Sequence, residues 1–208
     1  MKKPKEFVNR DLNTQLKFPV ISWSSMNQFS YSKDDWYSQY VLGIRSEINP
    51  AMAAGIAIGE RWASDPTFLS EVERPEIFEQ NYSAVIGDIK ITGHIDGLHL
   101  KKKKKLQELK TTVSKTKWTK DSVRSWGQLT MYTLFLYLHE RIKPEDLEME
   151  LIYVPVSENG NFEFKQSGQA IVIPTERTTL DILNFIIEIK RVHKEMCQFI
   201  EQKKLSTH

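Results

Sequence analysis

The chain contains almost no cysteine, since Cys197 is the single one among 208 residues. One cysteine cannot form a disulfide within the chain, and it excludes zinc or iron–sulfur sites built only from cysteines of one chain. Such usage is typical of a reducing compartment. The first residues, MKKPKEFVNRDLN, are basic but lack the apolar stretch of a secretory signal. The sequence therefore predicts a cytoplasmic protein.

Long apolar runs and interdomain linkers are also missing. The longest apolar run, residues 129–138, is about half the length that a helix needs to cross a bilayer, so we expect no membrane span. No repeat and no linker rich in Pro, Gly or Ser divides the chain. With 40% hydrophobic and 27% charged residues, the composition is that of a globular protein. We predict one domain over residues 1–208.

Positive charge is concentrated in one segment. The net charge of the whole chain is +2, but residues 101–124 contain ten Lys or Arg against Glu108 and Asp121. This segment therefore has a net charge of +8, and the remainder of the chain has −6. A positive face attracts a polyanion, because each neutralised phosphate releases counterions. The segment indicates a nucleic-acid partner, and the alternative is a solvated hairpin tip.

Hydrophobic spacing predicts a mixture of helices and strands. Helices are predicted over residues 22–43, as one or two short helices, and over residues 51–64, 119–141 and 175–202. Runs rich in β-branched residues predict an antiparallel meander over residues 82–86, 89–100 and 106–113, and two further strands over residues 149–156 and 169–174. This order is typical of an α/β or α+β fold, with a mixed central sheet between helices.

Three residues on two neighbouring strands indicate a metal site. Glu108 and Lys110 are two apart on a strand, so their side chains share one face. If the hairpin turns around Lys102, Asp96 on the preceding strand lies opposite Glu108, with the Cβ atoms roughly 5 Å apart. Facing carboxylates repel each other unless a cation or a proton lies between them. A hard divalent ion with oxygen ligands would remove this repulsion, and we expect Mg²⁺ or Mn²⁺.

A divalent ion at this place would support hydrolysis of a phosphodiester. Bound by Asp96, Glu108 and the backbone carbonyl of Leu109, it would polarise the phosphodiester and lower the pKa of a water molecule. Lys110 would position that water or stabilise negative charge on the phosphate. The Glu-x-Lys spacing by itself is weak evidence, because it recurs at residues 163/165, 188/190 and 201/203. A surface hairpin is the alternative.

Five motifs, in chain order, match a known nuclease family. ISWSSMNQF resembles a Ser-rich helix start, GIAIGE a first-helix motif, GHID an Asp strand, ELK a Glu-x-Lys strand and GQLTMY a Gln-x-x-x-Tyr helix motif. Together they resemble the RecB-like branch of the PD-(D/E)XK nuclease superfamily, which includes lambda-type exonucleases. The resemblance implies a restriction-endonuclease-like core and a Mg²⁺-dependent deoxyribonuclease, with exonuclease action favoured.

Other functions stay open at this point. The same fold and motifs would suit a structure-specific endonuclease, or a nucleic-acid-binding protein that has lost turnover. A third alternative is an interaction protein whose basic hairpin binds an acidic partner, but such a role does not require the motif residues.

The resemblance also assigns individual residues. It implies metal ligation by Asp96 and Glu108, catalysis by Lys110, and contacts with DNA or the active site by Gln128 and Tyr132. Gln128 and Tyr132 are four apart and therefore share one helix face. The alternative for Tyr132 is a core position, because the surrounding helix is apolar.

The first-helix motif departs from the family pattern. Relatives place His or Glu where this chain has Gly59, so the neighbouring Glu60 is the predicted third metal ligand. A solvated surface residue is the alternative for Glu60. His94 shares a strand face with Asp96 and is expected near the metal or the scissile phosphate, unless it is packed behind the ligands.

Further contacts with DNA are predicted around the catalytic strand and the first helix. They involve Ser25, Lys115, Lys117 and Arg124. Ser25 could instead cap its helix, and Trp118 could stack on a single strand or form the edge of the core. DNA is the expected partner, and a helicase or recombination protein would be a separate chain in phage or bacterial DNA processing. The sequence does not predict the oligomeric state.

Overall fold

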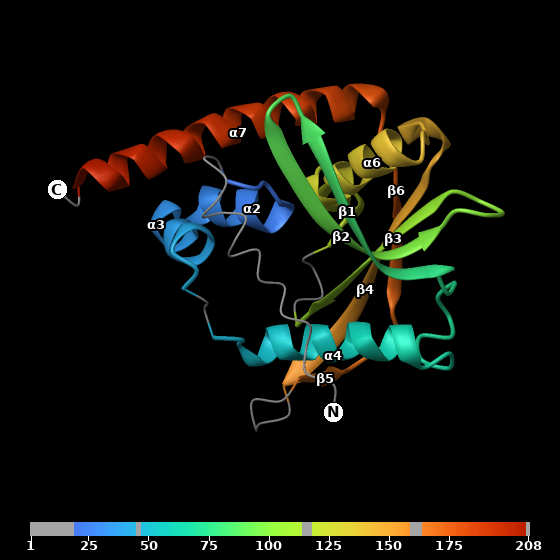
Figure 1. The fold of residues 1–208 in the computed structure, drawn as a ribbon. Helices are drawn as coiled ribbons and strands as arrows, with labels where there is room; N and C mark the ends of the chain where they lie inside the picture. The colour runs from blue at the N-terminus through green and yellow to red at the C-terminus, as the bar shows by residue number, and fades with distance from the viewer. Residues whose placement is uncertain (1–18, 45–46, 114–117, 159–163, 207–208) are drawn as a thin grey trace. The chain divides into compact units, whose positions relative to one another are not determined.

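The computed structural model describes residues 19–44, 47–113, 118–158 and 164–206. These residues belong to two compact units. The first unit takes its described residues from Met1–Ser46, Ala84–Thr92 and Ile186–His208, and the second from Glu47–Ser83 and Gly93–Phe185. Figure 1 labels the helices and strands. One domain over residues 1–208 stays a prediction, because two compact units can belong to one domain.

The first unit is built around the buried side chain of Trp36. The indole of Trp36 donates a hydrogen bond of 3.0 Å to the hydroxyl of Ser25, and the ring of Phe29 packs edge-on against it with centroids 4.9 Å apart. Ser22 and Ser32 cap the two α-helices that carry these residues. The short helices predicted here are confirmed, as α2 (Trp23–Tyr31), α3 (Lys33–Trp36) and the π-helix η1 (Tyr37–Val41).

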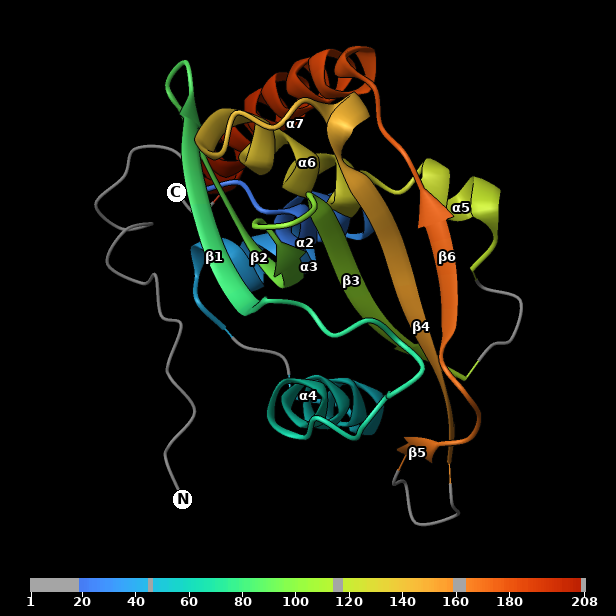
Figure 2. The ribbon, with the colours of Figure 1, turned by 90° about the vertical axis from the view of Figure 1, so that its right-hand side faces the viewer.

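A mixed six-stranded sheet forms the centre of the fold, as predicted (Figure 2). The strands β1, β2, β3 and β4 are neighbours in that order, and β5 and β6 both pair with β4. β2 and β3 are antiparallel, β3 and β4 are parallel, and β5 and β6 run antiparallel to β4. The strands are β1 (Ile77–Ile86), β2 (Ile89–His99), β3 (Lys105–Thr112), β4 (Glu148–Glu158), β5 (Phe164–Gln166) and β6 (Ile171–Thr175).

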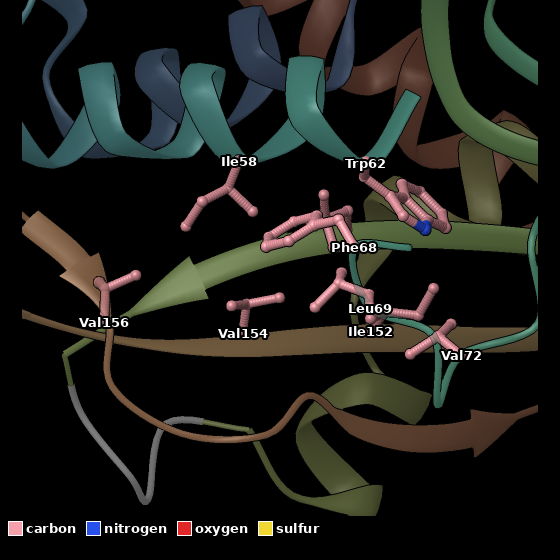
Figure 3. Packing of buried hydrophobic residues seen from close by; sticks show 9 residues of the cluster. Ile58, Trp62, Phe68, Leu69, Val72, Ile152, Val154 and Val156 are labelled. Atoms are coloured by element: carbon pink, nitrogen blue, oxygen red, sulfur yellow. The ribbon is translucent and has the colours of Figure 1, made fainter. Parts of the chain in front are cut away.

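The helix α4 (Pro50–Ser64) covers one face of the sheet in the second unit. Its buried residues Ile58 and Trp62 pack on Ile152, Val154 and Val156, which alternate along β4 (Figure 3). Alternate residues of a strand point to one face, so the intervening residues of β4 point to the other. Burial of this aliphatic and aromatic cluster stabilises the face that carries α4.

The helix α6 (Gly127–His139) packs on the opposite face. Thr133 of α6 donates a hydrogen bond of 3.1 Å to the sulfur of Met149, which has the opposite parity on β4 from the residues beneath α4. Residues 129–136 of α6 are all buried, which explains why the predicted helix is apolar nearly all round.

The prediction of one helix over residues 119–141 is wrong, because the structure contains two. α5 (Lys120–Arg124) ends before α6 begins. Arg177 is buried at this break, and its guanidinium donates 2.9 Å hydrogen bonds to the carbonyls of Val123 and Trp126. A distant side chain thus satisfies carbonyls that a continuous helix would have satisfied internally.

The remaining elements differ from the predictions mainly at their ends. The last helix, α7 (Thr179–Ser206), begins four residues later than predicted, because Thr178 and Asp181 cap it reciprocally. β1 begins five residues earlier than predicted, while β5 and the short 3-10 helix η2 (Pro144–Asp146) were not predicted. No helix in the described part of the chain has both the length and the apolar character that a membrane span requires.

Candidate active site

The strands β2 and β3 stop pairing at the predicted carboxylates. The register aligns Gly97 with Gln107, so the next step along the hairpin brings Asp96 opposite Glu108, as predicted. At that step the side chain of Asp96, through Oδ2, accepts the N–H of Leu109 at 2.8 Å. The Asp96 carboxylate therefore accepts a backbone hydrogen bond just beyond the last paired residues of β2 and β3. The two strands bring Asp96 and Glu108 close together.

Glu108 is the most deeply buried charged residue of the candidate site. Its side chain is fully buried, and its Oε1 accepts hydrogen bonds from Lys110 Nζ at 2.6 Å and from Gln128 Nε2 at 2.7 Å. Its second oxygen, Oε2, is buried and has no hydrogen-bond partner among the described residues. A buried carboxylate oxygen without a partner is costly in free energy, and it marks a place for a cation or a proton.

The electrostatics of the two acids favour binding of a cation. Burial, and then the nearby charge of Asp96, raise the pKa of Glu108 to about 8. Burial also raises the pKa of Asp96, although Lys110 and the N–H of Leu109 act in the opposite direction. Burial alone would lower the pKa of Lys110, but Glu108 and Asp96 outweigh it and raise that pKa. Lys110 is thus a stable cation beside carboxylates that are difficult to ionise together.

Gln128 and Tyr132 of α6 meet the carboxylates, as their shared helix face predicted. Gln128 Nε2 also donates to the hydroxyl of Tyr132 at 2.7 Å, and the backbone N–H of His94 donates to the same hydroxyl. Burial and the charges of Glu108 and Asp96 raise the pKa of Tyr132. Tyr132 is therefore both a core residue and a polar neighbour of the site.

A glycine lets α6 approach this strand. A Cβ atom on Gly93 would lie 2.6 Å from the ring of Phe135 and 3.0 Å from that of Tyr132. Any side chain here would push α6 away from β2 and separate Gln128 from Glu108. The Gly of the GHID motif thus has a packing role next to the Asp.

A cavity of about 1010 Å³ lies between α4 and the end of β3 and reaches the carboxylate of Asp96. Asp96, Lys110, Glu60 and Gly59 line it, and a Cβ atom on Gly59 would meet nothing within 4 Å. The structure therefore places Glu60 in the same cavity as Asp96, with its side chain exposed. Its role as a third metal ligand stays a prediction.

Trp126 lies beside the cationic end of Lys110, and a second tryptophan packs against it. The Lys110 ammonium lies 5.4 Å from the centre of the Trp126 ring. The rings of Trp126 and Trp118 are tilted against each other with centroids 4.8 Å apart. From the sequence, Trp118 was expected either to stack on single-stranded DNA or to form the edge of the core. In the structure it contacts Trp126, the neighbour of Lys110.

Two of the predicted DNA contacts have partners within the protein. Ser25 is buried in the first unit, and its hydroxyl accepts a hydrogen bond from Trp36. Its contact with DNA stays a prediction. Arg124 forms an ion pair of 2.8 Å with Asp181 at the start of α7, so it also joins two helices. Lys115 and Lys117 lie outside the described residues.

Sequence reasoning missed one acidic residue, Glu79, which lines the cavity with Asp96 and Lys110. It forms an ion pair with His94. The imidazole of His94, which we expected near the metal or the phosphate, therefore has the Glu79 carboxylate as its partner. The strand prediction began at Tyr82, so it gave Glu79 no position on a face. A longer predicted strand would have revealed it.

The donor set fits a hard divalent cation. It offers the carboxylates of Asp96 and Glu108, and the Oε2 of Glu108 is buried without a hydrogen-bond partner among the described residues. The carbonyl of Leu109 as a further ligand stays a prediction. Within the described residues, no three His, Cys, Asp or Glu side chains are close enough together to hold one ion. Mg²⁺ commonly completes its coordination with water and phosphate oxygens, so two protein carboxylates suit it.

Comparison with solved structures identifies a shared fold. The chain superposes on a candidate exonuclease from Eubacterium rectale with a TM-score of 0.60 and 14% sequence identity, covering 98% of this chain and 87% of that one. An alkaline exonuclease from Laribacter hongkongensis gives a TM-score of 0.46 and 12% identity, covering 95% and 100% of the two chains. No protein-family model and no curated sequence matches. The first similarity shows that the chain has the fold of that Eubacterium protein.

Proposed function

We propose that this protein is a Mg²⁺- or Mn²⁺-dependent deoxyribonuclease of the PD-(D/E)XK type, and that it acts as an exonuclease. The observation that carries the proposal is the fully buried Glu108, which lies beside Asp96. Its Oε2 lacks a hydrogen-bond partner among the residues that the structure describes, while Lys110 pairs with Oε1. This arrangement is unfavourable for a structural core and suitable for a cation site. The shared fold with a candidate exonuclease supports the same assignment.

Each residue has a distinct part in this proposal. Asp96, Glu108 and the carbonyl of Leu109 would bind the cation, which polarises the phosphodiester and makes a water molecule more acidic. Lys110, held by Glu108 at 2.6 Å, stabilises the negative charge that develops on the phosphate. Gln128 holds Glu108 in place from α6 through its 2.7 Å hydrogen bond.

The basic segment and the tryptophans would bind the DNA strand. The ring of Trp126 lies beside Lys110 and contacts Trp118, and we propose that a nucleobase next to the scissile phosphate stacks on this pair. We also propose a helicase or recombination protein as a partner.

The test uses linear duplex DNA and covalently closed circular DNA. The proposal expects Mg²⁺-dependent loss of linear DNA, survival of the circles, and no cleavage in EDTA. Asp96→Ala and Lys110→Ala should each lower the rate by about 100-fold or more, in keeping with the loss of an electrostatic catalytic group. Lys190→Ala is the matched control, because it removes the lysine of another Glu-x-Lys pair, on the exposed side of α7.

The outcomes separate the alternatives. Degradation in EDTA, or full activity in both site variants, would contradict the proposed site. Cleavage of the circles would support the endonuclease alternative while leaving the site intact. Salt-dependent binding of DNA without cleavage in Mg²⁺ or Mn²⁺ would support the inactive binding protein.

A further inference from the structure

We propose that Arg177 is a positioning residue for Lys110, and that it acts through Trp126. The inference rests on the proposed function, because Lys110 is the catalytic residue of that site. The guanidinium of Arg177 holds the backbone of Trp126, and the ring of Trp126 lies beside the Lys110 ammonium. Two contacts therefore connect a buried cation with the catalytic one.

The guanidinium of Arg177 is buried and uses all of its donors. Only 1% of Arg177 is exposed. Nε donates to the hydroxyl of Thr130 at 2.7 Å, and Nη2 donates to the carbonyls of Val123 and Trp126 at 2.9 Å each. Nη1 donates to one oxygen atom of each of the two preceding residues. Five N–H groups thus meet five neutral oxygen atoms, in a planar fork that a lysine cannot reproduce.

The charge of Arg177 serves the backbone at the break between α5 and α6. A buried cation that bonds to neutral groups loses its hydration without gaining an opposite charge in contact, which is costly in free energy. In return, its bonds to the carbonyls of Val123 and Trp126 fix one arrangement of the chain at this break. We infer that this arrangement has a purpose beyond stability.

The break directs the side chain of Trp126. In a continuous helix, Trp126 would share a face with Val123 and Thr130, which are both buried. In the structure, Trp126 is the N-cap of α6 and has the extended values φ −76° and ψ 115°. Its indole is half-buried and lies beside Lys110. The direction of the ring therefore depends on the break that Arg177 stabilises.

The ring of Trp126 gives Lys110 a second contact. The ammonium lies 5.4 Å from the centre of the ring, within the range of a cation–π interaction. Its other contact is with Glu108 Oε1, at 2.6 Å. One carboxylate restricts an ammonium only weakly, because the ammonium is a compact charge on a flexible stem. The second contact restricts the place of the Lys110 ammonium beside Glu108.

The surroundings of Arg177 allow a local test. Arg177 follows β6, and β6 lies beside α5 (Figure 2). The ion pair between Arg124 and Asp181 also joins α5 to the start of α7, and it does not involve Arg177. Removal of Arg177 would leave this second connection in place. We therefore expect the main change at Trp126.

The first measurement is the NMR signal of the Lys110 side chain, in full-length protein that contains isotope-labelled lysine. Lys110→Ala assigns the signal. The ring current of Trp126 should shift the Cε–H signal of Lys110 upfield, and Trp126→Leu should remove this shift. Arg177→Ala should remove most of it in the folded protein. Thr130→Val is a milder variant, which removes only the hydrogen bond to Nε, and it should remove part of the shift.

The second measurement is the cleavage of linear DNA in Mg²⁺ at saturating DNA, expressed per folded protein. Arg177→Ala should lower kcat about 10-fold or more, because a small displacement of a catalytic group is costly in rate. Guanidinium chloride, well below denaturing concentrations, should occupy the space of the missing side chain. It should restore part of kcat and part of the upfield shift of Lys110.

Arg74→Ala is the matched control. Arg74 also donates to backbone carbonyls at a helix end, those of Trp62 and Ala63 in α4. Its removal should lower stability in the same way as the removal of Arg177. The Lys110 signal should remain unchanged in this variant, with or without guanidinium.

Three results would overturn the inference. One is a wild-type Lys110 signal in folded Arg177→Ala and in Thr130→Val. The second is an equal change of that signal in Arg74→Ala, and the third is a normal kcat in Arg177→Ala. The third result would leave the proposed function standing without Arg177. If the wild type cleaves no DNA in Mg²⁺ or Mn²⁺, the proposed function fails, and the NMR signal still decides whether Arg177 positions Trp126 beside Lys110.

Discussion

The carboxylate of Asp96 accepts the backbone N–H of Leu109 at 2.8 Å, just beyond the last paired residues of β2 and β3. This contact joins the side chain of Asp96, on β2, to the backbone of β3, the strand that carries Glu108. The last paired residues next to this contact are Gly97 and Gln107. Stability and the proposed chemistry therefore depend on the same few residues.

The metal-free protein should lose stability as the pH rises. Glu108 has a pKa of about 8 in the folded chain, against an ordinary value of 4.5. Because the folded pKa is the higher one, this stabilisation is complete below pH 4.5 and is lost as the pH rises through 8. Relative to Glu108→Gln, the wild type in EDTA should lose on the order of a few kcal/mol between pH 5 and 9.

Unfolding by urea at several pH values measures this difference. Mn²⁺ should restore stability to the wild type at pH 9 and restore much less to Glu108→Gln. A wild type and a variant with parallel pH profiles would show that Glu108 ionises normally, and the cation site would lose its main support.

Breaking the link from α6 to Glu108 should impair activity. Gln128→Ala removes the 2.7 Å hydrogen bonds to Glu108 and to Tyr132. We expect a loss of metal affinity or activity of about 10- to 100-fold, which is typical when a partner of a metal ligand is removed. Tyr137→Phe is the control, because it removes a hydroxyl from the half-exposed side of the same helix. Equal rates in Gln128→Ala and Tyr137→Phe would mean that Gln128 does not orient Glu108.

Adding one methyl group at Gly93 should destabilise the protein. The new Cβ of Gly93→Ala would lie 2.6 Å from the ring of Phe135, which is fully buried and cannot move freely. Overpacking of this kind costs about 1–3 kcal/mol. Gly59→Ala is the matched substitution in open space within α4, and it should stabilise the helix by about 0.5–1 kcal/mol. Thermal unfolding of both variants measures the contrast, and a neutral Gly93→Ala would contradict the close packing of α6.

Removing Arg177 should destabilise the break between α5 and α6. The guanidinium donates to the carbonyls of Val123 and Trp126 and to the hydroxyl of Thr130. Arg177→Met leaves these buried acceptors without partners, and each loss costs about 1–3 kcal/mol. We therefore expect a total of at least about 3 kcal/mol in urea unfolding. Arg191→Met removes only exposed ion pairs on α7 and should cost less than about 1 kcal/mol.

The sequence by itself determined the local parts of this protein. Alternation and β-branched residues located β2 and β3, and the turn at the lysine run set the register that brings Asp96 opposite Glu108. Spacing by four placed Gln128 and Tyr132 on one helix face. These features follow from the periods of strands and helices, which involve residues near each other in the chain.

Only the tertiary structure decided the rest, because it depends on residues far apart in the chain. Arg177 breaks the predicted helix from 51 residues away, through the carbonyl of Trp126. Burial by α6 and the sheet, which no local pattern reveals, raises the pKa of Glu108. The left-handed backbone of Glu79 and its pairing with His94 bring a third acid into the cavity. Burial and long-range pairing therefore determine the electrostatics of the site.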